Sequence, residues 1–175
     1  MARLELTEDT TVVLAVGLAA MLVLATVAYT YTQPRPYKHF FEIYPLGPGK
    51  MAANYPTKIE VGKPTNIWLG VSNHMGRVEY VLVYVKIGAN ATAIPNDITL
   101  TPSPVTPYKQ IEYFLMDNQT QIFPVSIAIN KPGLNYNVMF ELWHYNETAG
   151  GFRYAWHDGS VYRATWSQIW LNVTA

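Results

Sequence analysis

The pattern of apolar and polar positions divides the chain into two parts of different character. Residues 12–31 read VVLAVGLAAMLVLATVAYTY, an apolar run without a charge. After residue 39 the apolar positions alternate with polar ones in short runs that Pro and Gly interrupt. An unbroken apolar run predicts a membrane-spanning helix, whereas alternation with a period of two predicts β-strands.

The apolar run predicts an uncleaved membrane anchor. At about 1.5 Å per residue it spans the hydrocarbon core, which is about 30 Å thick. A cleaved signal peptide has a basic start and a shorter apolar core, but the leader MARLELTEDT is mainly acidic. We expect residues 1–11 to form a short tail, residues 12–31 a transmembrane helix in contact with the lipid bilayer, and residues 32–39 a spacer.

Residues 40–175 show the pattern of an all-β, extracytoplasmic domain. Strands are predicted at 40–47, 57–62, 64–72, 77–87, 97–101, 108–116, 121–129 and 135–145, with more in FRYAWHDG and YRATWSQIWLNVT. Short strands in this number, in a segment of this length, predict a two-sheet sandwich of immunoglobulin-like type. The predicted fold is therefore an immunoglobulin-like β-sandwich preceded by one N-terminal transmembrane α-helix.

The segment VSNHMGRVEY, residues 71–80, contains a His–Met pair of the kind that binds copper. Its central residues also suit a hairpin turn, in which Gly76 adopts a positive φ and Asn73 bonds its own backbone. We expect His74 and Met75 to be turn residues of a β-hairpin. A metal site would require another histidine close to His74 in space.

The other histidines do not converge in the predicted register. In the hairpin around NETAGG we expect Tyr145 to pair with Phe152. This register places His144 and His157 on one face but about 13 Å apart, at about 3.3 Å per residue. One ion cannot bridge that distance, so no metal ligand and no cofactor is predicted.

Composition narrows the classes of function further. The 12 basic residues balance the 12 acidic ones, which leaves no surplus to neutralise nucleic-acid phosphates. The absence of cysteine excludes disulfides, thiolate zinc sites and a blue-copper centre. The stretch HDGS at 157–160 reads as a turn, and LGPGK at 46–50 lacks the ending of a phosphate loop. No catalytic residue is predicted, and we expect a protein that is not an enzyme.

Glycosylation sequons and Lys/Arg counts bear on the orientation in the membrane. Basic residues flank the anchor on both sides, so their counts do not decide the orientation of the chain. Chance predicts about one N-x-Ser/Thr sequon in this composition, but four follow the anchor. The excess favours a cytoplasmic N-terminus and a C-terminal domain outside the cell. The candidate glycosylation sites are Asn90, Asn118, Asn146 and Asn172.

Aromatic residues crowd the last 35 positions of the chain. They fit core and cross-strand packing, but Tyr and Trp are also favoured anchors of binding surfaces. Contact with the membrane surface is a third interpretation. The candidate interface residues are Trp143, Tyr145, Tyr154, Trp156, Trp166 and Trp170.

Two stretches resemble a family of archaeal predicted membrane proteins of unknown function. The resemblance rests on FFEIYPLGPGK, NYPT, VG, the V-x-NH-x-G-x-x-x-Y segment and the closing RATWSQIWLNVT, over roughly residues 40–174. It implies a membrane location and an extracytoplasmic immunoglobulin-like domain, and it implies no activity. Many members have several helices before this domain, whereas one is predicted here.

Together these patterns predict a single-pass membrane protein that acts by binding. We expect an accessory subunit of a membrane complex or a cell-envelope component, whose partners are other membrane or envelope proteins or a second copy of the chain. The alternative is a filament subunit of pilin or archaellin type, although a processing site is missing at the helix border. A third class is an extracytoplasmic metal-binding protein.

Overall fold

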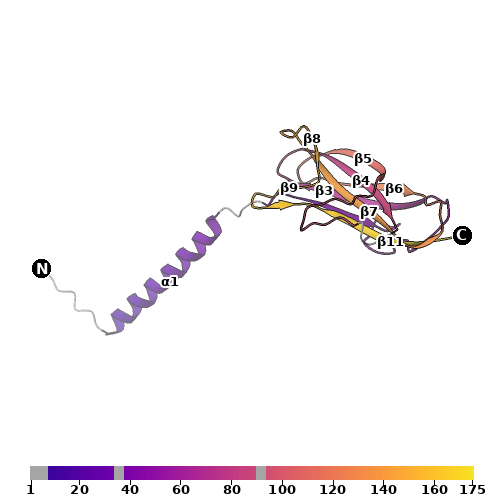
Figure 1. The fold of residues 1–175 in the computed structure, drawn as a ribbon. Helices are drawn as coiled ribbons and strands as arrows, with labels where there is room; N and C mark the ends of the chain where they lie inside the picture. The colour runs from indigo at the N-terminus through magenta and orange to yellow at the C-terminus, as the bar shows by residue number, and fades with distance from the viewer. Residues whose placement is uncertain (1–7, 34–37, 90–93) are drawn as a thin grey trace. The chain divides into compact units, whose positions relative to one another are not determined.

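The computed structural model describes residues 8–33, 38–89 and 94–175, and Figure 1 shows the chain. The chain divides into two units, Met1–Tyr37 and Lys38–Ala175, and each is described by itself. The predicted tail and spacer lie partly outside the described residues.

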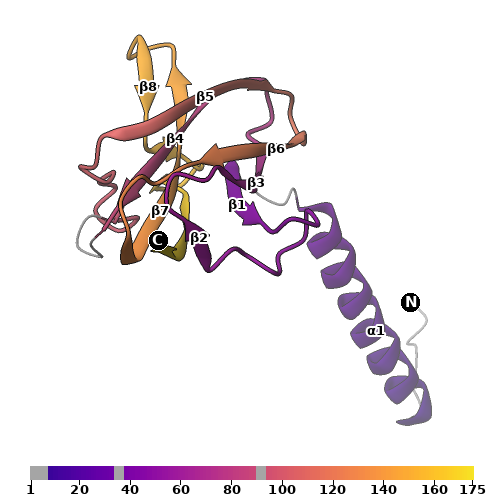
Figure 2. The same ribbon diagram turned by 90° about the vertical axis from the view of Figure 1, so that its right-hand side faces the viewer.

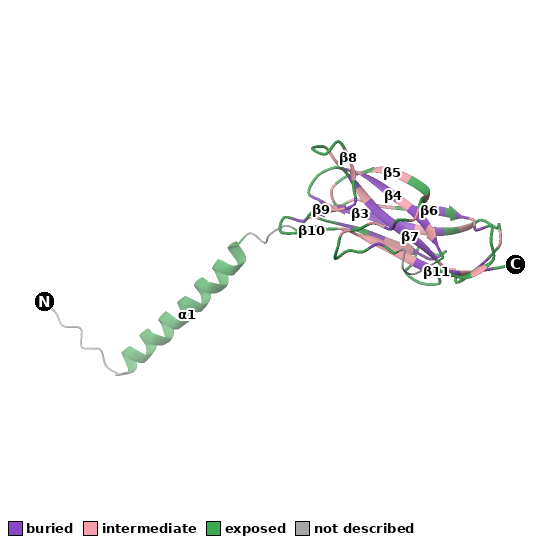
Figure 3. Cartoon of the chain, viewed as in Figure 1, coloured by how far each residue is buried: buried purple, intermediate pink, exposed green. Residues whose placement is uncertain are grey.

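The first unit contains helix α1, Glu8–Thr32. It begins earlier than the apolar run because Asp9 suits the positive end of the helix dipole. Every described residue of the helix is exposed within the structure (Figure 3). The hydroxyl groups of three threonines donate to carbonyls one turn back, for example Thr26 Oγ1 to Leu22 O at 2.7 Å.

The second unit consists of short strands in two packed sheets (Figures 1 and 2). The strands are β1 Phe40–Leu46, β2 Lys58–Glu60, β3 Thr65–His74, β4 Glu79–Gly88, β5 Pro107–Leu115, β6 Thr120–Ile127, β7 Gly133–Asn146, β8 Gly151–Arg153, β9 Trp156–His157, β10 Tyr162–Arg163 and β11 Trp166–Thr174.

The sheet topology is that of an immunoglobulin-like sandwich, as the alternation of the sequence predicts. One sheet has the order β1-β3-β6, and the other has the order β2-β11-β7-β4-β5, with β8 added to β7. Strands β9 and β10 form a separate two-stranded sheet. The first two strands of the domain lie in different sheets, since β1 pairs antiparallel with β3 and β2 pairs parallel with β11.

The core lies between the two sheets (Figure 3). Alternate residues of the central strands point into it and are fully buried, as period-two patterning requires. From β3 these are Ile67, Leu69 and Val71, and from β4 and β7 they are Val81, Val83, Val85, Val138, Phe140 and Leu142.

The predicted hairpin at VSNHMGRVEY is wrong. Strands β3 and β4 belong to different sheets, so the connection between them crosses from one sheet to the other. Gly76 has the expected positive φ of 73°, and Asn73 Oδ1 accepts from the backbone N–H of Met75. The turn chemistry was readable, but a turn of this length joins strands within a sheet or between sheets equally well.

The predicted strand at 97–101 is also wrong. This segment forms turns with one isolated bridge, Asn96 to Thr101. Asn96 Oδ1 accepts from the backbone N–H groups of Ile98 and Thr99, which holds the backbone in a turn rather than in a ladder.

Candidate functional site

A groove of about 690 Å³ opens at the start of β4, and this size is within the range of ligand sites. It is lined by residues 77–80, Phe114 and residues 145–148. These come from β4 and the connection before it, from the edge strand β5, and from β7 with the turn after it. Three separate segments therefore meet at one concave surface.

Aromatic rings form the wall of the groove. Register places Tyr80 opposite Phe114 and Tyr145 opposite Phe152. The rings of Tyr80 and Phe114 are stacked, with centroids 4.4 Å apart. Tyr80 also lies 5.0 Å from Phe152 and 6.0 Å from Tyr145. Because 71% of Phe114 is exposed, one ring face of this cluster is available to a ligand.

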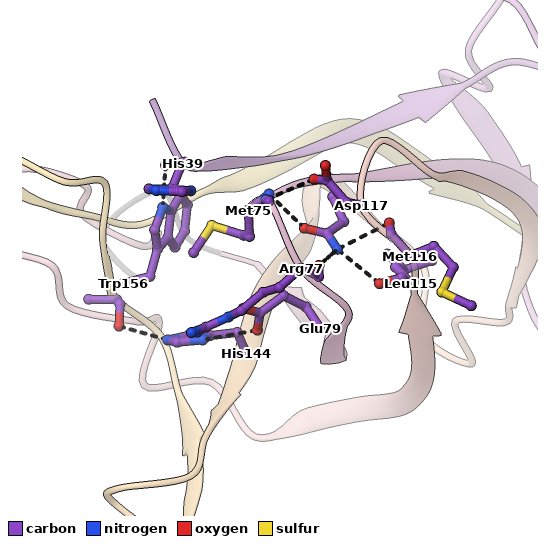
Figure 4. A network of polar contacts seen from close by, with 12 residues as sticks. His39, Met75, Arg77, Glu79, Leu115, Met116, Asp117, His144 and Trp156 are labelled. Carbon is purple, nitrogen blue, oxygen red and sulfur yellow. Dashed lines mark hydrogen bonds and ion pairs between the residues drawn. The ribbon is translucent and has the colours of Figure 1, made fainter. Parts of the chain in front are cut away.

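The charged lining residues Arg77 and Glu79 belong to a network of polar contacts (Figure 4). Arg77 Nε donates to Glu79 Oε1 at 2.6 Å, and Glu79 is buried. The other carboxylate oxygen lies 3.6 Å from His144 Nδ1, and His144 Nε2 lies 3.3 Å from the Ala155 carbonyl oxygen. The ion pair with Glu79 orients the exposed Arg77 side chain in the lining of the groove.

The pKa of Glu79 reflects two opposing effects. Burial raises the pKa, but the hydrogen bonds and positive charges of His144 and Arg77 outweigh it, so the pKa lies below its ordinary value. On the wall, the hydrogen bond from the Tyr80 hydroxyl to Glu112 raises the pKa of Tyr80. Glu79 is therefore charged at neutral pH.

The lowered pKa of Glu79 predicts a loss of stability in acid. The proton binds more readily to the unfolded chain, so the stabilisation is complete above the ordinary pKa of 4.5 and is lost as the pH falls through the folded value. We expect the native chain to be more stable than Glu79→Gln at pH 7 and the difference to shrink towards pH 3. Urea unfolding of the full chain in detergent, followed by tryptophan fluorescence, measures this.

The exposed substitution Glu60→Gln is the matched control and is expected to give no such pH-dependent difference. A difference between the native chain and Glu79→Gln that stays constant from pH 7 to pH 3 would contradict the assignment.

Asn73 fastens the connection between β3 and β4. It is fully buried, and its amide group donates to the carbonyls of Arg77, Leu115 and Met116 at 2.8, 2.9 and 3.1 Å. Asp117 Oδ1 in turn accepts from the backbone N–H of Gly76. The β3–β4 and β5–β6 connections are thus tied together at one end of the sandwich.

A buried ion pair lies on the outer face of the larger sheet. Lys86 Nζ is 2.8 Å from Glu141 Oε2, and the side chains are 5% and 0% exposed. Lys86 also donates to the Ser103 carbonyl, and Glu141 accepts from the backbone N–H of Ser103 and from Trp143 Nε1. The pair holds the segment around Ser103 onto β4 and β7.

The structure corrects two of the aromatic interface candidates. Trp156 is a buried core residue whose Nε1 donates to the His39 carbonyl and whose ring packs edge-on against Phe41. Tyr154 is also buried, and burial followed by the charges of Glu141 and Asp97 raises its pKa well above the ordinary value. Neither residue belongs to an exposed surface.

The other four candidates lie on the outer face of the larger sheet. Trp143 is half-buried and bonded to Glu141, and Tyr145 lines the groove. Trp166 and Trp170 follow on β11, and only Trp170 is largely exposed. The structure does not gather the four into one patch, because Trp170 pairs with the opposite end of β7, at Asn137.

Sequence reasoning missed most of the groove. The lining residues Tyr80 and Phe114 were not singled out, nor was Phe152, whose ring packs against Tyr80, although strand β5 carries a readable signal. Ile111, Tyr113 and Leu115 alternate towards the interior, which leaves Phe114 as an outward aromatic on an edge strand. The confirmed pairing of Tyr145 with Phe152 places the Phe152 ring edge-on against Tyr145, which lines the groove.

Three of the four sequons lie in the described residues, and Asn90 lies outside them. The amide oxygen of each of the three is engaged: Asn118 with His74 Nδ1, Asn146 with the Ala149 N–H, and Asn172 with the Asn135 N–H. Asn146 and Thr148 line the groove. Glycosylation at any of these positions stays a prediction.

The histidine arrangement offers little for a metal. His74 is stacked on Phe40, 4.5 Å between ring centroids, and His157 packs edge-on against Tyr162. Over residues 8–33, 38–89 and 94–175, no group of three His, Asp or Glu side chains is placed to hold an ion.

The HDGS stretch forms a turn, as its sequence predicts. In this turn Asp158 accepts from the N–H groups of Val161 and Ser160 and from Arg163. These contacts lower the pKa of Asp158, and the hydrogen bond from the Val161 N–H has the largest effect.

The fold is that of an immunoglobulin-like β-sandwich domain, and the sequence places it in a family. Residues 34–156 match the family described as domain of unknown function DUF1616, and the chain belongs to this family. No protein with a curated description is significantly similar to the chain in sequence.

Several solved structures are similar in fold. A crystal structure of the CARDB domain of the PF1109 protein from Pyrococcus furiosus, in complex with di-metal ions, is 12% identical and covers 82% of this chain and 95% of that chain, with a TM-score of 0.49. The ASH/PapD-like domain of human CEP192 is 13% identical, and the match covers 82% of this chain and 91% of that chain, with a TM-score of 0.39. A β-glucosidase from Listeria innocua in complex with glucose is 7% identical over 78% of this chain and 16% of that enzyme, with a TM-score of 0.43. At these identities and scores the similarity does not extend to ligands or activity.

Proposed function

We propose that the chain is a single-pass membrane protein that holds an immunoglobulin-like domain outside the cell and acts by binding a partner, not by catalysis. In this proposal it is an accessory subunit of a membrane complex or a cell-envelope component of archaeal type. The observation that carries the proposal is helix α1, because its apolar residues are uncovered.

The helix has the properties that a lipid environment requires. Asp9–Thr32 is long and apolar enough to cross a membrane, and none of its apolar window is buried in the structure. A bilayer offers no water to polar groups, so each must be satisfied within the helix. Thr26, Thr30 and Thr32 meet this condition by donating to backbone carbonyls of the helix itself.

The sequons and the groove support the location and the mode of action. Three described sequons lie in the β-domain, which fits a domain that enters the compartment of glycosylation. The groove combines exposed aromatic rings with charged groups, which is the composition of a recognition site. A charge balance of 12 against 12 does not favour nucleic acid as the partner.

Co-purification tests this proposal. The chain is extracted from its native membrane in mild detergent, sized by native gel, and its companions are identified by mass spectrometry. We expect defined membrane or envelope proteins at a fixed ratio. A ladder of homo-oligomers without companions would instead indicate a filament or self-assembling envelope protein.

A further inference from the structure

We propose that the groove at the start of β4 receives a basic segment of the partner protein, with a guanidinium or ammonium group against the aromatic wall. This inference rests on the proposed function and names the chemistry of its partner. It is carried by the balance of charges at the groove and by the open ring face of Phe114.

The charges around the groove leave an acidic excess. Arg77 is compensated by Glu79, to which it is bonded at 2.6 Å. Two further carboxylates lie at this site without a basic partner among the ion pairs of the described residues: Glu147 in the lining and Glu112, which accepts from the Tyr80 hydroxyl. A positively charged side chain complements this arrangement.

Arg153, on the neighbouring strand β8, does not neutralise the excess. Arg153 lies opposite His144, so it projects from the other face of the β7–β8 hairpin than Phe152 does. Its guanidinium donates to the carbonyls of Phe152 and Ala149. Arg153 lines a second, separate pocket rather than the groove.

The aromatic wall supplies the second element of recognition. A cation within about 6 Å of a ring face is attracted by the π-system, and a guanidinium also stacks on the ring. Phe114 is stacked on Tyr80 on one side, and its high exposure leaves the other side open. An arginine laid on that open side would have the carboxylates of Glu112 and Glu147 as neighbours.

A peptide titration tests the inference. The full chain, produced in a host without N-glycosylation and held in detergent micelles, is titrated at low salt with the capped peptide Gly-Arg-Gly-Arg-Gly. The same peptide with citrulline in place of arginine keeps the shape and removes the charge. Binding is followed by NMR through the signals of Tyr80, Phe114 and Tyr145.

We expect saturable binding of the arginine peptide that shifts these signals, and weak or no binding of the citrulline peptide. Phe114→Ala and Glu147→Gln are each expected to lower the affinity about two- to five-fold. The matched controls are Trp170→Ala, an exposed aromatic on the same face, and Glu60→Gln, an exposed carboxylate on β2. Both are expected to leave the affinity unchanged.

Three results would overturn the inference: equal binding of the two peptides, unchanged affinity in both groove variants, or saturable binding of a neutral oligosaccharide such as cellohexaose with no binding of the arginine peptide. Failure here is distinct from failure of the proposed function. If companions co-purify equally with the native chain, Phe114→Ala and Glu147→Gln, the membrane complex stands and the groove is not its contact site.

Discussion

Replacing Lys86 with methionine is expected to lower the free energy of unfolding by about 3–5 kcal/mol. The substitution leaves Glu141 charged, fully buried and without its cation. The loss also removes the hydrogen bond from Lys86 to the Ser103 carbonyl, which fastens the segment before β5. Urea unfolding of the full chain in detergent, followed by tryptophan fluorescence, gives the free energy.

A double variant separates the buried charge from the lost packing. Lys86→Met with Glu141→Gln removes both charges but keeps an oxygen that accepts from Ser103 or Trp143. We expect it to recover at least half of the lost stability. The exposed pair of Lys63 and Glu60 provides the control, since Lys63→Met should cost about 0–1 kcal/mol. Equal costs for Lys63→Met and Lys86→Met would show that the Lys86 pair is not buried in solution.

Replacing Asn73 with alanine is the second large effect, with an expected loss of about 3–4 kcal/mol. The side chain serves several buried backbone groups at once, and a buried group left without a partner costs about 1–3 kcal/mol. The lost contacts are those to the carbonyls of Arg77, Leu115 and Met116 and from the N–H of Met75. The same unfolding measurement applies.

Asn66 is the matched control for Asn73. It lies on the same strand, β3, but is exposed. Asn66→Ala is expected to change the stability by less than about 0.5 kcal/mol. If Asn73→Ala were as mild as Asn66→Ala, the two connections at that end of the sandwich would not depend on this side chain.

The fold class and much of the local pattern follow from the sequence alone. In β7, Val138, Phe140 and Leu142 point into the core, as their alternation predicts. The pairing of Tyr145 with Phe152 is also confirmed, but the ladder does not continue to His157, which pairs with Tyr162 instead. These features depend on neighbours in sequence, which is why period-two patterning and turn chemistry reveal them.

Features that depend on distant segments were not predictable. The segment around Asn73 has hairpin chemistry, but pairing with β1 and β6 places β3 in the other sheet from β4. Lys86 and Glu141 look like solvent-facing residues of two strands, and only the segment around Ser103 covers them. Trp156 is buried for a similar reason, because its contacts Phe41 and His39 are distant in the sequence, at the start of the domain.

The candidate site was predicted only in part. Tyr145 belongs to the groove. The aromatic density near the C-terminus also predicts Trp156 and Tyr154 as interface residues, but both are buried. The wall is completed by Tyr80 and Phe114 from earlier strands, whose proximity depends on the pairing of β4 with β5. Composition marks aromatic-rich segments, whereas the sheet order decides which rings meet.

The central claim is that the β-domain lies outside the cell on a membrane anchor. Since the chain has no cysteine, single cysteines introduced at Ala2 and at the exposed Ser126 on β6 report the two sides without background. A membrane-impermeant maleimide is applied to intact cells and to permeabilised cells. We predict that Ser126→Cys is labelled in intact cells and that Ala2→Cys is labelled only after permeabilisation, with both variants remaining in the membrane fraction after alkaline washing. Labelling of Ala2→Cys but not Ser126→Cys in intact cells, or release of the chain by the alkaline wash, would contradict the account.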